Sequence, residues 1–291
     1  MDLPLLLAAI TFLGWGTGDL FTIVAVRKIG ALRTTFWVFA FSFLLTLIVI
    51  PFVPHNFAAI TFPLLLLNIF LGILYISGNI LVSEAFRISS APLVGVIIQA
   101  FPAVVLLLSA LIFKDRILPS QAIFIAIIFV GVILCSVDFK QVRYSKKLVD
   151  KGTALALIAM TCLAIFFTFS RILIDAYGWF LPSFLATACF PIIYLFIKKR
   201  KEKLIVPMRP RILLATFMVG LLIRSGDFAL NYGLTLPNAS SIVAPIAGAS
   251  PILFVISSAL IYKDKVTKQQ ILGIVVTLIG IFLLTSLGVK G

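Results

Sequence analysis

The sequence predicts an all-α membrane protein with ten transmembrane helices, arranged as two inverted five-helix repeats. First, 62% of the 291 residues are hydrophobic and only 12% are charged, whereas soluble domains are roughly 45–50% apolar. Second, apolar runs of about 20 residues, the length of a helix that spans a bilayer, recur along the whole chain. Third, the second half repeats spaced features of the first. A soluble fold could not bury this much apolar surface.

The apolar runs are separated by short charged or proline-containing links, and the alternating pattern of barrel strands does not occur. The first run has no basic segment before it and no cleavage site after it, so we expect a retained helix rather than a signal peptide. The predicted spans are Leu3–Val26, Thr34–Val53, Pro63–Phe86, Ala91–Phe113, Ser120–Val137, Gly152–Ile172, Leu181–Ile197, Ile212–Tyr232, Ser241–Tyr262 and Gln269–Leu287.

Basic residues lie mainly in the links that follow odd-numbered spans. These links hold nineteen of the 24 Lys and Arg residues, the other links and the C-terminal segment hold four, and Arg224 lies inside a span. Cytoplasmic links of membrane proteins are rich in Lys and Arg. We therefore expect an inner-membrane protein with its odd-numbered links in the cytoplasm and both termini outside. The net charge of +14 then reflects topology rather than nucleic-acid binding.

The chain matches itself when it is shifted by about 149 residues. Spaced matches of this kind are hard to obtain from apolar composition alone, so the halves are predicted to be duplicates. The clearest pairings are Phe113–Arg116 with Tyr262–Lys265, Pro102 with Pro251, and Gly131 with Gly280. We predict a first repeat over residues 1–137, a linker over 138–151 and a second repeat over 152–291.

Each predicted repeat has five helices, an odd number, so the second enters the membrane upside down relative to the first. Inverted repeats are the architecture of alternating-access transporters, whose substrate site lies near the bilayer midplane between the repeats. A duplicated structural bundle is the alternative.

The first span contains Gly14-Trp15-Gly16, and in each half a proline is followed by a span, a short charged turn and a glycine-containing final helix. With five plus five spans, this pattern makes the whole chain resemble the EamA-type transporters of the drug/metabolite transporter superfamily. The resemblance implies secondary transport of metabolites, amino acids or organic cations, commonly outward. Members usually carry Glu at the turn after the fourth and ninth spans, where this chain has Lys114-Asp115 and Lys263-Asp264.

A further departure concerns the fifth span of each half. In the second half Gln270 precedes Gly273, as in the family pattern, whereas in the first half Gln121 precedes Phe124. Glycine permits close helix contact. We expect the last span to pack tightly through Gly273 and Gly280, within the molecule rather than between protomers.

Three ionisable residues inside spans are the leading functional candidates: Asp19, Arg224 and Asp227. A charge at the bilayer centre costs about 2.5–3.5 kcal/mol, so such residues usually face a cavity or a partner. Asp19 has no basic neighbour on its helix nearer than Arg27, about two turns away. A carboxylate in a low-dielectric cavity is suited to taking up and releasing a proton, so Asp19 is the predicted proton-coupling residue. A hydrogen-bonded aspartate near the interface is the alternative.

Arg224 and Asp227 are three residues apart and share one helix face, so they could simply neutralise each other. Alternatively they line a cavity, where Arg224 would hold a carboxylate and Asp227 an ammonium group or a proton. Asn79 occupies the place of Asp227 in the first half. Both interpretations stay open at this point.

Further side chains could face the same central space. Trp15 lies one turn before Asp19, and the two could form an aromatic and anionic surface for a cation. Ordinary hydrogen bonding between helices is the alternative for each. The predicted substrate-binding residues are Trp15, Asp19, Tyr75, Asn79, Gln99, Arg224, Asp227 and Asn231.

Prolines in the fourth and ninth spans predict kinks, because proline removes a backbone hydrogen bond. The kinks could be gating hinges or static bends, and the candidates are Pro92, Pro102, Pro245 and Pro251.

Two charge pairs near span ends are predicted from their spacing, Glu84 with Arg87 and Arg171 with Asp175. We expect no functional role for either pair.

Several functions are excluded by what the sequence lacks. It contains no phosphate-binding loop and no nucleophile motif, its single histidine, His55, lies in a link, and its three cysteines lie in apolar runs. We therefore expect no enzymatic activity, no cofactor and no metal site.

The sequence predicts a monomeric secondary transporter in the lipid bilayer, exporting small metabolites such as amino acids, with protons as a coupling partner if Asp19 titrates. An amino acid fits the charges of both Asp19 and Arg224. The alternatives are a multidrug or quaternary-amine exporter and, in another class, a membrane scaffold or receptor that transports nothing.

Overall fold

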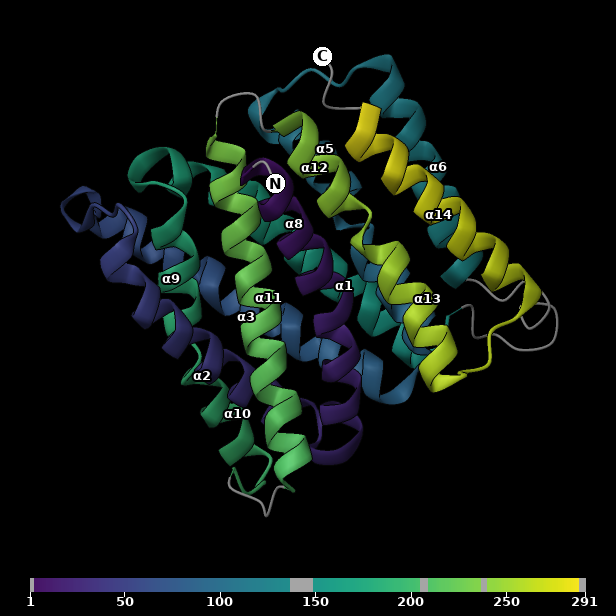
Figure 1. The fold of residues 1–291 in the computed structure, drawn as a ribbon, viewed down its shortest axis with the longest axis horizontal. Helices are drawn as coiled ribbons and strands as arrows, with labels where there is room; N and C mark the ends of the chain where they lie inside the picture. Colours follow the sequence, from purple (N-terminus) through teal and green to yellow (C-terminus); the bar gives the residue numbers. More distant parts are fainter. Residues whose placement is uncertain (1–2, 137–148, 205–208, 237–239, 288–291) are drawn as a thin grey trace.

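The structure, a computed structural model, describes residues 3–136, 149–204, 209–236 and 240–287, and within these ranges it is helical and has no strand. The predicted all-α fold is therefore confirmed (Figure 1). The first half contains α1 (Leu3–Ile29), α2 (Ala31–Val49), α3 (Phe62–Ile88), α4 (Ala91–Gln99), α5 (Phe101–Phe113) and α6 (Pro119–Ser136). The second half contains α8 (Lys151–Tyr177), α9 (Phe180–Ala188), α10 (Ile192–Lys199), α11 (Pro210–Thr235), α12 (Ser240–Gly248), α13 (Ser250–Tyr262) and α14 (Lys268–Leu287).

The described helices define a multi-pass membrane protein. Nine segments of the described chain are long and apolar enough to cross a membrane. The tenth predicted span corresponds to α12 and α13, whose described apolar stretch, Ile246–Tyr262, is shorter, so the count of ten stays a prediction. Most of the predicted linker, 138–151, lies outside the described residues. At its end, Asp150 caps α8 by accepting hydrogen bonds from the backbone N–H groups of Gly152 and Thr153.

Three of the predicted spans are each divided into two helices. α4 and α5 meet at Ala100, α12 and α13 meet at Ala249, and α9 and α10 meet at residues 189–191. Pro102 and Pro251 lie in the first turn of the helix that follows the break. Each lacks the N–H group that would bond to the preceding turn, which accounts for the break.

The other two prolines do not mark these breaks. Pro92 lies in the first turn of α4, where a proline removes no bond within the helix, so the kink predicted there is wrong. Pro245 lies inside α12 rather than at its end. The break before α10, where Pro191 is the N-cap residue, was not among the predicted kinks.

The two halves build the same turns at equivalent positions. The turns after α1 and α8 contain Gly30 and Gly178, with φ of 86° and 87°. After α5 and α13, Lys114 and Lys263 adopt the left-handed conformation that closes a helix C-terminus. The φ values of Gly30 and Gly178 are ones that residues other than glycine rarely adopt.

The fifth span of each half also begins in the same way. Gln121 Oε1 accepts a hydrogen bond from the backbone N–H of Leu118, and Gln270 Oε1 accepts one from Thr267, both at 2.9 Å. Gln121 and Gln270, which occupy equivalent positions in the two halves, therefore each accept a hydrogen bond at the start of the helix.

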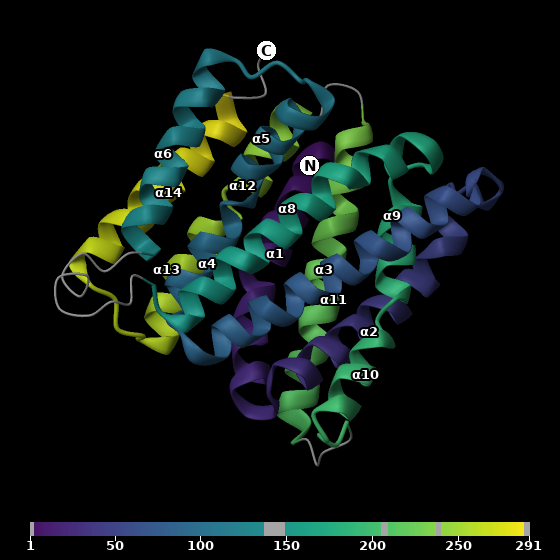
Figure 2. The ribbon, with the colours of Figure 1, turned by 180° about the vertical axis from the view of Figure 1, so that it is seen from behind.

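Helix packing follows a pseudo-two-fold relation between the halves. α1 packs against α11 as α3 packs against α8, and α1 contacts α13 as α8 contacts α5. α6 packs against α14, and α4 packs against α13. α1 and α8 run in opposite directions (Figures 1 and 2). This arrangement supports the prediction of inverted repeats.

α6 and α14 approach closely through glycine, within one molecule as predicted. A Cβ atom added to Gly273 would lie 2.7 Å from the backbone nitrogen of Cys135, and one added to Gly131 would lie 2.6 Å from that of Thr277. Gly280 faces the backbone of Ile128 at 3.0 Å. The helix backbones therefore leave no room for side chains at these three positions.

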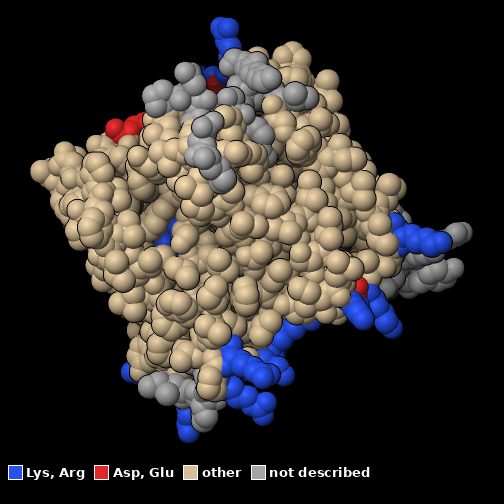
Figure 3. All heavy atoms as spheres, viewed as in Figure 1, with Lys and Arg blue, Asp and Glu red and all other residues tan. Residues whose placement is uncertain are grey.

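On the outer surface that Figure 3 shows, charged side chains gather toward the ends of the molecule. On the face drawn in Figure 3, Lys and Arg gather along the lower margin, and a broad middle band is largely uncharged. Such a band is what a lipid-facing surface requires.

Candidate substrate cavity

A cavity of about 100 Å³ lies between the two halves. It is bounded by α1, α3, α8, α11 and the junction of α4 with α5. Six of the predicted substrate-binding residues line it: Trp15, Asp19, Tyr75, Asn79, Gln99 and Asp227. Its other lining residues are apolar: Val82, Ile98, Phe101, Leu163, Phe167 and Ile223.

Asp19 lies on α1 and reaches this cavity from the first half. Its carboxylate makes no hydrogen bond and no ion pair with any described residue, in contrast to Asp227. Arg27, the nearest basic residue on α1, pairs with Asp264 instead. Asp19 is therefore a half-buried acidic group that is available to a solute or a proton.

Gly14, in the Gly14-Trp15-Gly16 motif, allows α1 to approach α11, whereas Gly16 faces Leu253 on α13. A Cβ atom added to Gly14 would lie 2.5 Å from the carbonyl oxygen of Leu222, and one added to Gly18 would lie 2.6 Å from Cγ1 of Ile223. At Gly14 only glycine permits the backbones to come this close, whereas Gly18 faces the side chain of Ile223. The contact brings the indole of Trp15 within reach of polar groups on α11.

Trp15, Asp227, Arg224 and Thr187 form one connected network. Trp15 Nε1 donates a hydrogen bond to Asp227 Oδ1 at 2.9 Å. Asp227 Oδ2 lies 3.3 Å from Arg224 Nη1, and Arg224 Nη2 donates to Thr187 Oγ1 on α9 at 2.6 Å. The Arg224 side chain is only 4% exposed. Of the two interpretations left open by the sequence, the structure therefore favours mutual pairing of Arg224 and Asp227.

Arg224 and Asn231, the two remaining predicted residues, do not line the central cavity. They line a smaller neighbouring pocket of about 30 Å³ that shares Trp15, Tyr75 and Asp227 with it. Arg224 Nε has no hydrogen-bond acceptor among the described residues. The Nε–H donor of this guanidinium group is therefore not used by any described residue.

Aromatic rings make much of the cavity wall. The ring of Tyr75 stacks on Phe166 with 4.4 Å between centroids, and Phe101 stacks on Phe167 at 5.0 Å. Asn79 Nδ2 donates to the backbone oxygen of Tyr75 on its own helix. A flat aromatic wall next to a free carboxylate is suited to an organic cation.

Phe101, Phe167 and Thr187 were missed by the sequence analysis. Phe167 lies 148 residues after Asp19, the spacing that also separates Gly30 from Gly178. The repeat alignment could therefore have identified Phe167, because it occupies in the second half the position that Asp19 occupies in the first. No spacing rule connects Thr187 with Arg224, because the two residues lie on different helices, α9 and α11.

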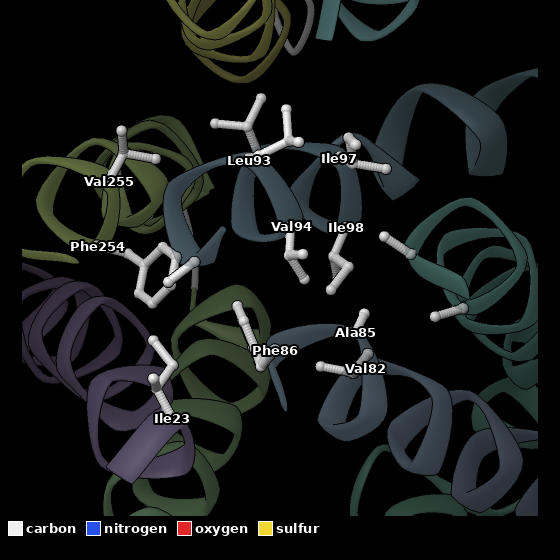
Figure 4. Packing of buried hydrophobic residues seen from close by; sticks show 14 of the residues in the cluster. Ile23, Val82, Ala85, Phe86, Leu93, Val94, Ile97, Ile98, Phe254 and Val255 are labelled. Carbon is white, nitrogen blue, oxygen red and sulfur yellow. The ribbon is translucent and has the colours of Figure 1, made fainter. Parts of the chain in front are cut away.

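One end of the cavity is closed by an apolar cluster (Figure 4). Ile23, Phe86, Val94 and Phe254 belong to it, and they come from α1, α3, α4 and α13. Val82 and Ile98 belong to both the cluster and the cavity lining. The Phe254 ring lies over Gly95, where an added Cβ would come within 2.0 Å of it. Along α1 the cavity residue Asp19 precedes the cluster residue Ile23, and the helix ends at Ile29, so this cluster lies between the cavity and the end of α1.

Charged groups at the helix ends pair partly as predicted. Glu84 and Arg87 form the predicted pair, at 2.6 Å. The predicted pair of Arg171 with Asp175 is wrong, because Arg171 reaches Asp115 in the other half at 2.7 Å. Spacing along one helix could not reveal a partner from a different helix.

The fold and the cavity define a class: multi-pass α-helical membrane proteins built from two repeats around a central cavity. The profile of the EamA-like transporter family matches residues 2–137 and 150–286, one match on each half. The chain therefore belongs to the EamA-like transporter family, and the resemblance stated from the sequence is confirmed.

Other comparisons add information on the fold alone. A solved structure described only as "Crystal structure of protein" is similar over 98% of this chain and 98% of its own, with a TM-score of 0.66 and 14% identity. A comparison with curated proteins finds no match.

Proposed function

We propose that this protein is a secondary transporter that carries a small organic solute with an ammonium group through the central cavity, using Asp19 as the binding carboxylate. The observation that carries this proposal is the difference between the two cavity aspartates. Asp227 is held by Arg224 and Trp15, whereas Asp19 has no partner among the described residues.

Charge balance supports a monocation as the substrate. Arg224 and Asp227 neutralise each other, which leaves one formal negative charge, on Asp19, facing the cavity. A buried charge is costly unless it is paired or protonated. A solute ammonium group or a proton would meet that need, and competition between the two at Asp19 would couple solute movement to proton movement.

The cavity wall supports an organic rather than an inorganic cation. Rings of Trp15, Tyr75, Phe101 and Phe167 line the space, and aromatic faces attract organic ammonium groups. The volume of about 100 Å³ suits a compact metabolite.

Amino-acid transport is a second candidate, and one observation favours it. Arg224 Nε, buried and without an acceptor among the described residues, could bind a carboxylate from the pocket that adjoins the cavity. A zwitterion would then span from Asp19 to Arg224. This candidate requires the solute to compete with Asp227 and Thr187 for the guanidinium group.

Alternating access between the two halves is the mechanism we propose, with the breaks at Pro102 and Pro251 as hinges. The bias of basic residues supports an inner-membrane location with odd-numbered links in the cytoplasm. Export is the direction that the family resemblance implies. Since both halves lie in one chain and enclose the cavity, a monomer is sufficient.

Solute flux in proteoliposomes tests the proposal. Purified protein is reconstituted, and uptake and efflux of radiolabelled amines and amino acids are measured with and without a pH gradient. Asp19→Asn is compared with Asp175→Asn, an exposed aspartate on α8. We expect amine flux that depends on the gradient, is lost in Asp19→Asn and persists in Asp175→Asn.

Each contrary result has a defined meaning. Flux that Asp19→Asn leaves unchanged would remove Asp19 from the mechanism. Flux restricted to amino acids, with no flux of the corresponding amines, would favour the second candidate. The absence of flux for every solute would favour a scaffold or receptor.

A further inference from the structure

Two ion pairs link the halves at opposite ends of the molecule. At the end of α1, Arg27 Nη2 lies 2.7 Å from Asp264 Oδ2. Near the end of α8, Arg171 Nη1 lies 2.7 Å from Asp115 Oδ2. Because α1 and α8 run in opposite directions, the pairs lie at opposite ends, which are called here the Arg27 end and the Arg171 end (Figures 1 and 2).

The two pairs have the same construction. Each joins an arginine on the first helix of one half to the aspartate that follows a left-handed lysine in the other half, Lys263 or Lys114. In each, the guanidinium group also lies over an aromatic ring, that of Tyr262 at 5.0 Å or that of Phe113 at 5.4 Å. Such matched contacts between the halves cannot persist if the halves separate at that end.

The Arg27 end is the more strongly closed. Asp264 Oδ2 also accepts a hydrogen bond from the backbone N–H of Ala91 at 2.9 Å, and the Tyr262 hydroxyl donates one to the backbone oxygen of Leu20. The side chains of this pair are 32% and 18% exposed, against 53% and 43% for Arg171 and Asp115. The apolar cluster of Figure 4 lies between this end and the cavity.

We propose that these two ion pairs are the gate contacts of the transporter: Arg27–Asp264 holds one end shut, Arg171–Asp115 holds the other, and their unequal strength sets which end opens more readily. Opening toward the Arg27 end requires Asp264 to release both Arg27 and Ala91. Opening toward the Arg171 end breaks one exposed pair. The protein therefore rests with the Arg27 end closed more often than the Arg171 end.

Thiol labelling tests this inference without any solute. It rests on the proposed two-state cycle, but labelling reports the conformation alone, so its failure is distinguishable from a wrong substrate. The three cysteines are replaced by alanine, and a reporter is added as Val82→Cys, next to the Figure 4 cluster, or as Leu230→Cys, beyond Trp15 on the other side. An impermeant maleimide is applied to right-side-out and inside-out membrane vesicles.

The two gate variants should act in opposite directions. Asp264→Asn should raise Val82→Cys labelling from the Arg27 end about twofold to fivefold, the range expected for the loss of one partly exposed ion pair, and should lower Leu230→Cys labelling from the Arg171 end. Asp115→Asn should raise Leu230→Cys labelling and lower that of Val82→Cys. The exchange Arg27→Asp with Asp264→Arg should return labelling toward the starting values.

Glu84→Gln is the matched control. It removes an ion pair within a single helix at the Arg27 end, with the similar distance of 2.6 Å, and should leave both reporters unchanged. The proposal is overturned if both gate variants shift labelling in the same direction, if neither changes it, or if Glu84→Gln has the same effect as Asp264→Asn.

Discussion

The indole Nε1 of Trp15 on α1 donates a hydrogen bond to Asp227 Oδ1 on α11 over 2.9 Å, from one half of the chain to the other. This bond completes the partners of Asp227, which also pairs with Arg224. It explains why the two cavity aspartates differ: Asp227 is paired with Trp15 and Arg224, whereas the carboxylate of Asp19 has no partner among the described residues. The substitutions below separate these roles.

Replacing Trp15 by Phe should weaken the network while keeping an aromatic wall. Hydrogen bonds to charged groups contribute about 1.5–3 kcal/mol, and we expect a loss of free energy of unfolding in that range. The loss should be smaller in the Asp227→Asn background, because the bond is then already weakened. Detergent unfolding curves of the single and double variants provide the measurement, and equal losses in both backgrounds would contradict the bond.

Arg224→Gln should be among the most destabilising substitutions in the chain. It leaves Asp227 as an unpaired charge in the protein interior, which costs about 3–5 kcal/mol when one partner of a buried pair is removed. Adding Asp227→Asn should restore most of the lost thermal stability. Arg87→Gln, which breaks an exposed pair of the same spacing, is the control and should cost less than about 1 kcal/mol. If the double variant is no more stable than Arg224→Gln, the unpaired charge of Asp227 is not the cause of the lost stability.

Gly14→Ala should separate α1 from α11. Its Cβ would meet the Leu222 carbonyl oxygen, a backbone atom, at 2.5 Å, and overpacking of this kind costs about 1–3 kcal/mol. Gly16→Ala should cost less, because its Cβ meets the side chain of Leu253, which can move. Thermal melting in detergent checks the order of the two variants. A lower melting temperature for Gly16→Ala than for Gly14→Ala would contradict the packing described.

Pro102→Ala and Pro251→Ala should slow transport more than they weaken binding. Alanine restores the backbone N–H group at each break and so favours a straighter helix. We expect a lower maximal flux with little change in the solute concentration for half-maximal flux. Pro92→Ala is the matched control, because Pro92 lies in the first turn of α4 and interrupts no hydrogen bond. If all three variants behave alike, the breaks are static bends.

Composition and periodicity were sufficient to predict the helical membrane fold, and most of the cavity followed from one physical rule. Charged and polar groups inside spans must face something other than lipid. That rule identified Asp19, Arg224 and Asp227; the two aspartates line the cavity, and Arg224 lines the neighbouring pocket. The repeat then indicated which segments are equivalent, and the family match falls on the same two halves.

Contacts between different helices could not be predicted from the spacing of residues along one helix. The pairing of Arg171 with Asp115 depends on how the halves dock, and the bond from Arg224 to Thr187 depends on where α9 and α11 lie within the second half. Spacing along one helix suggested Asp175 for Arg171, because periodicity describes a single helix only. The break before α10 was missed although Pro191 lies inside the predicted span Leu181–Ile197, where a proline removes a backbone hydrogen bond.

Equilibrium binding to the purified protein tests the central claim most directly. An amine and the amino acid from which it derives by decarboxylation are titrated into wild type, Asp19→Asn and Asp175→Asn, with heat of binding as the readout. The account predicts that the amine binds wild type and Asp175→Asn with similar affinity and loses at least about tenfold in Asp19→Asn, the equivalent of one charge-assisted hydrogen bond. Amine binding that survives unchanged in Asp19→Asn would contradict it.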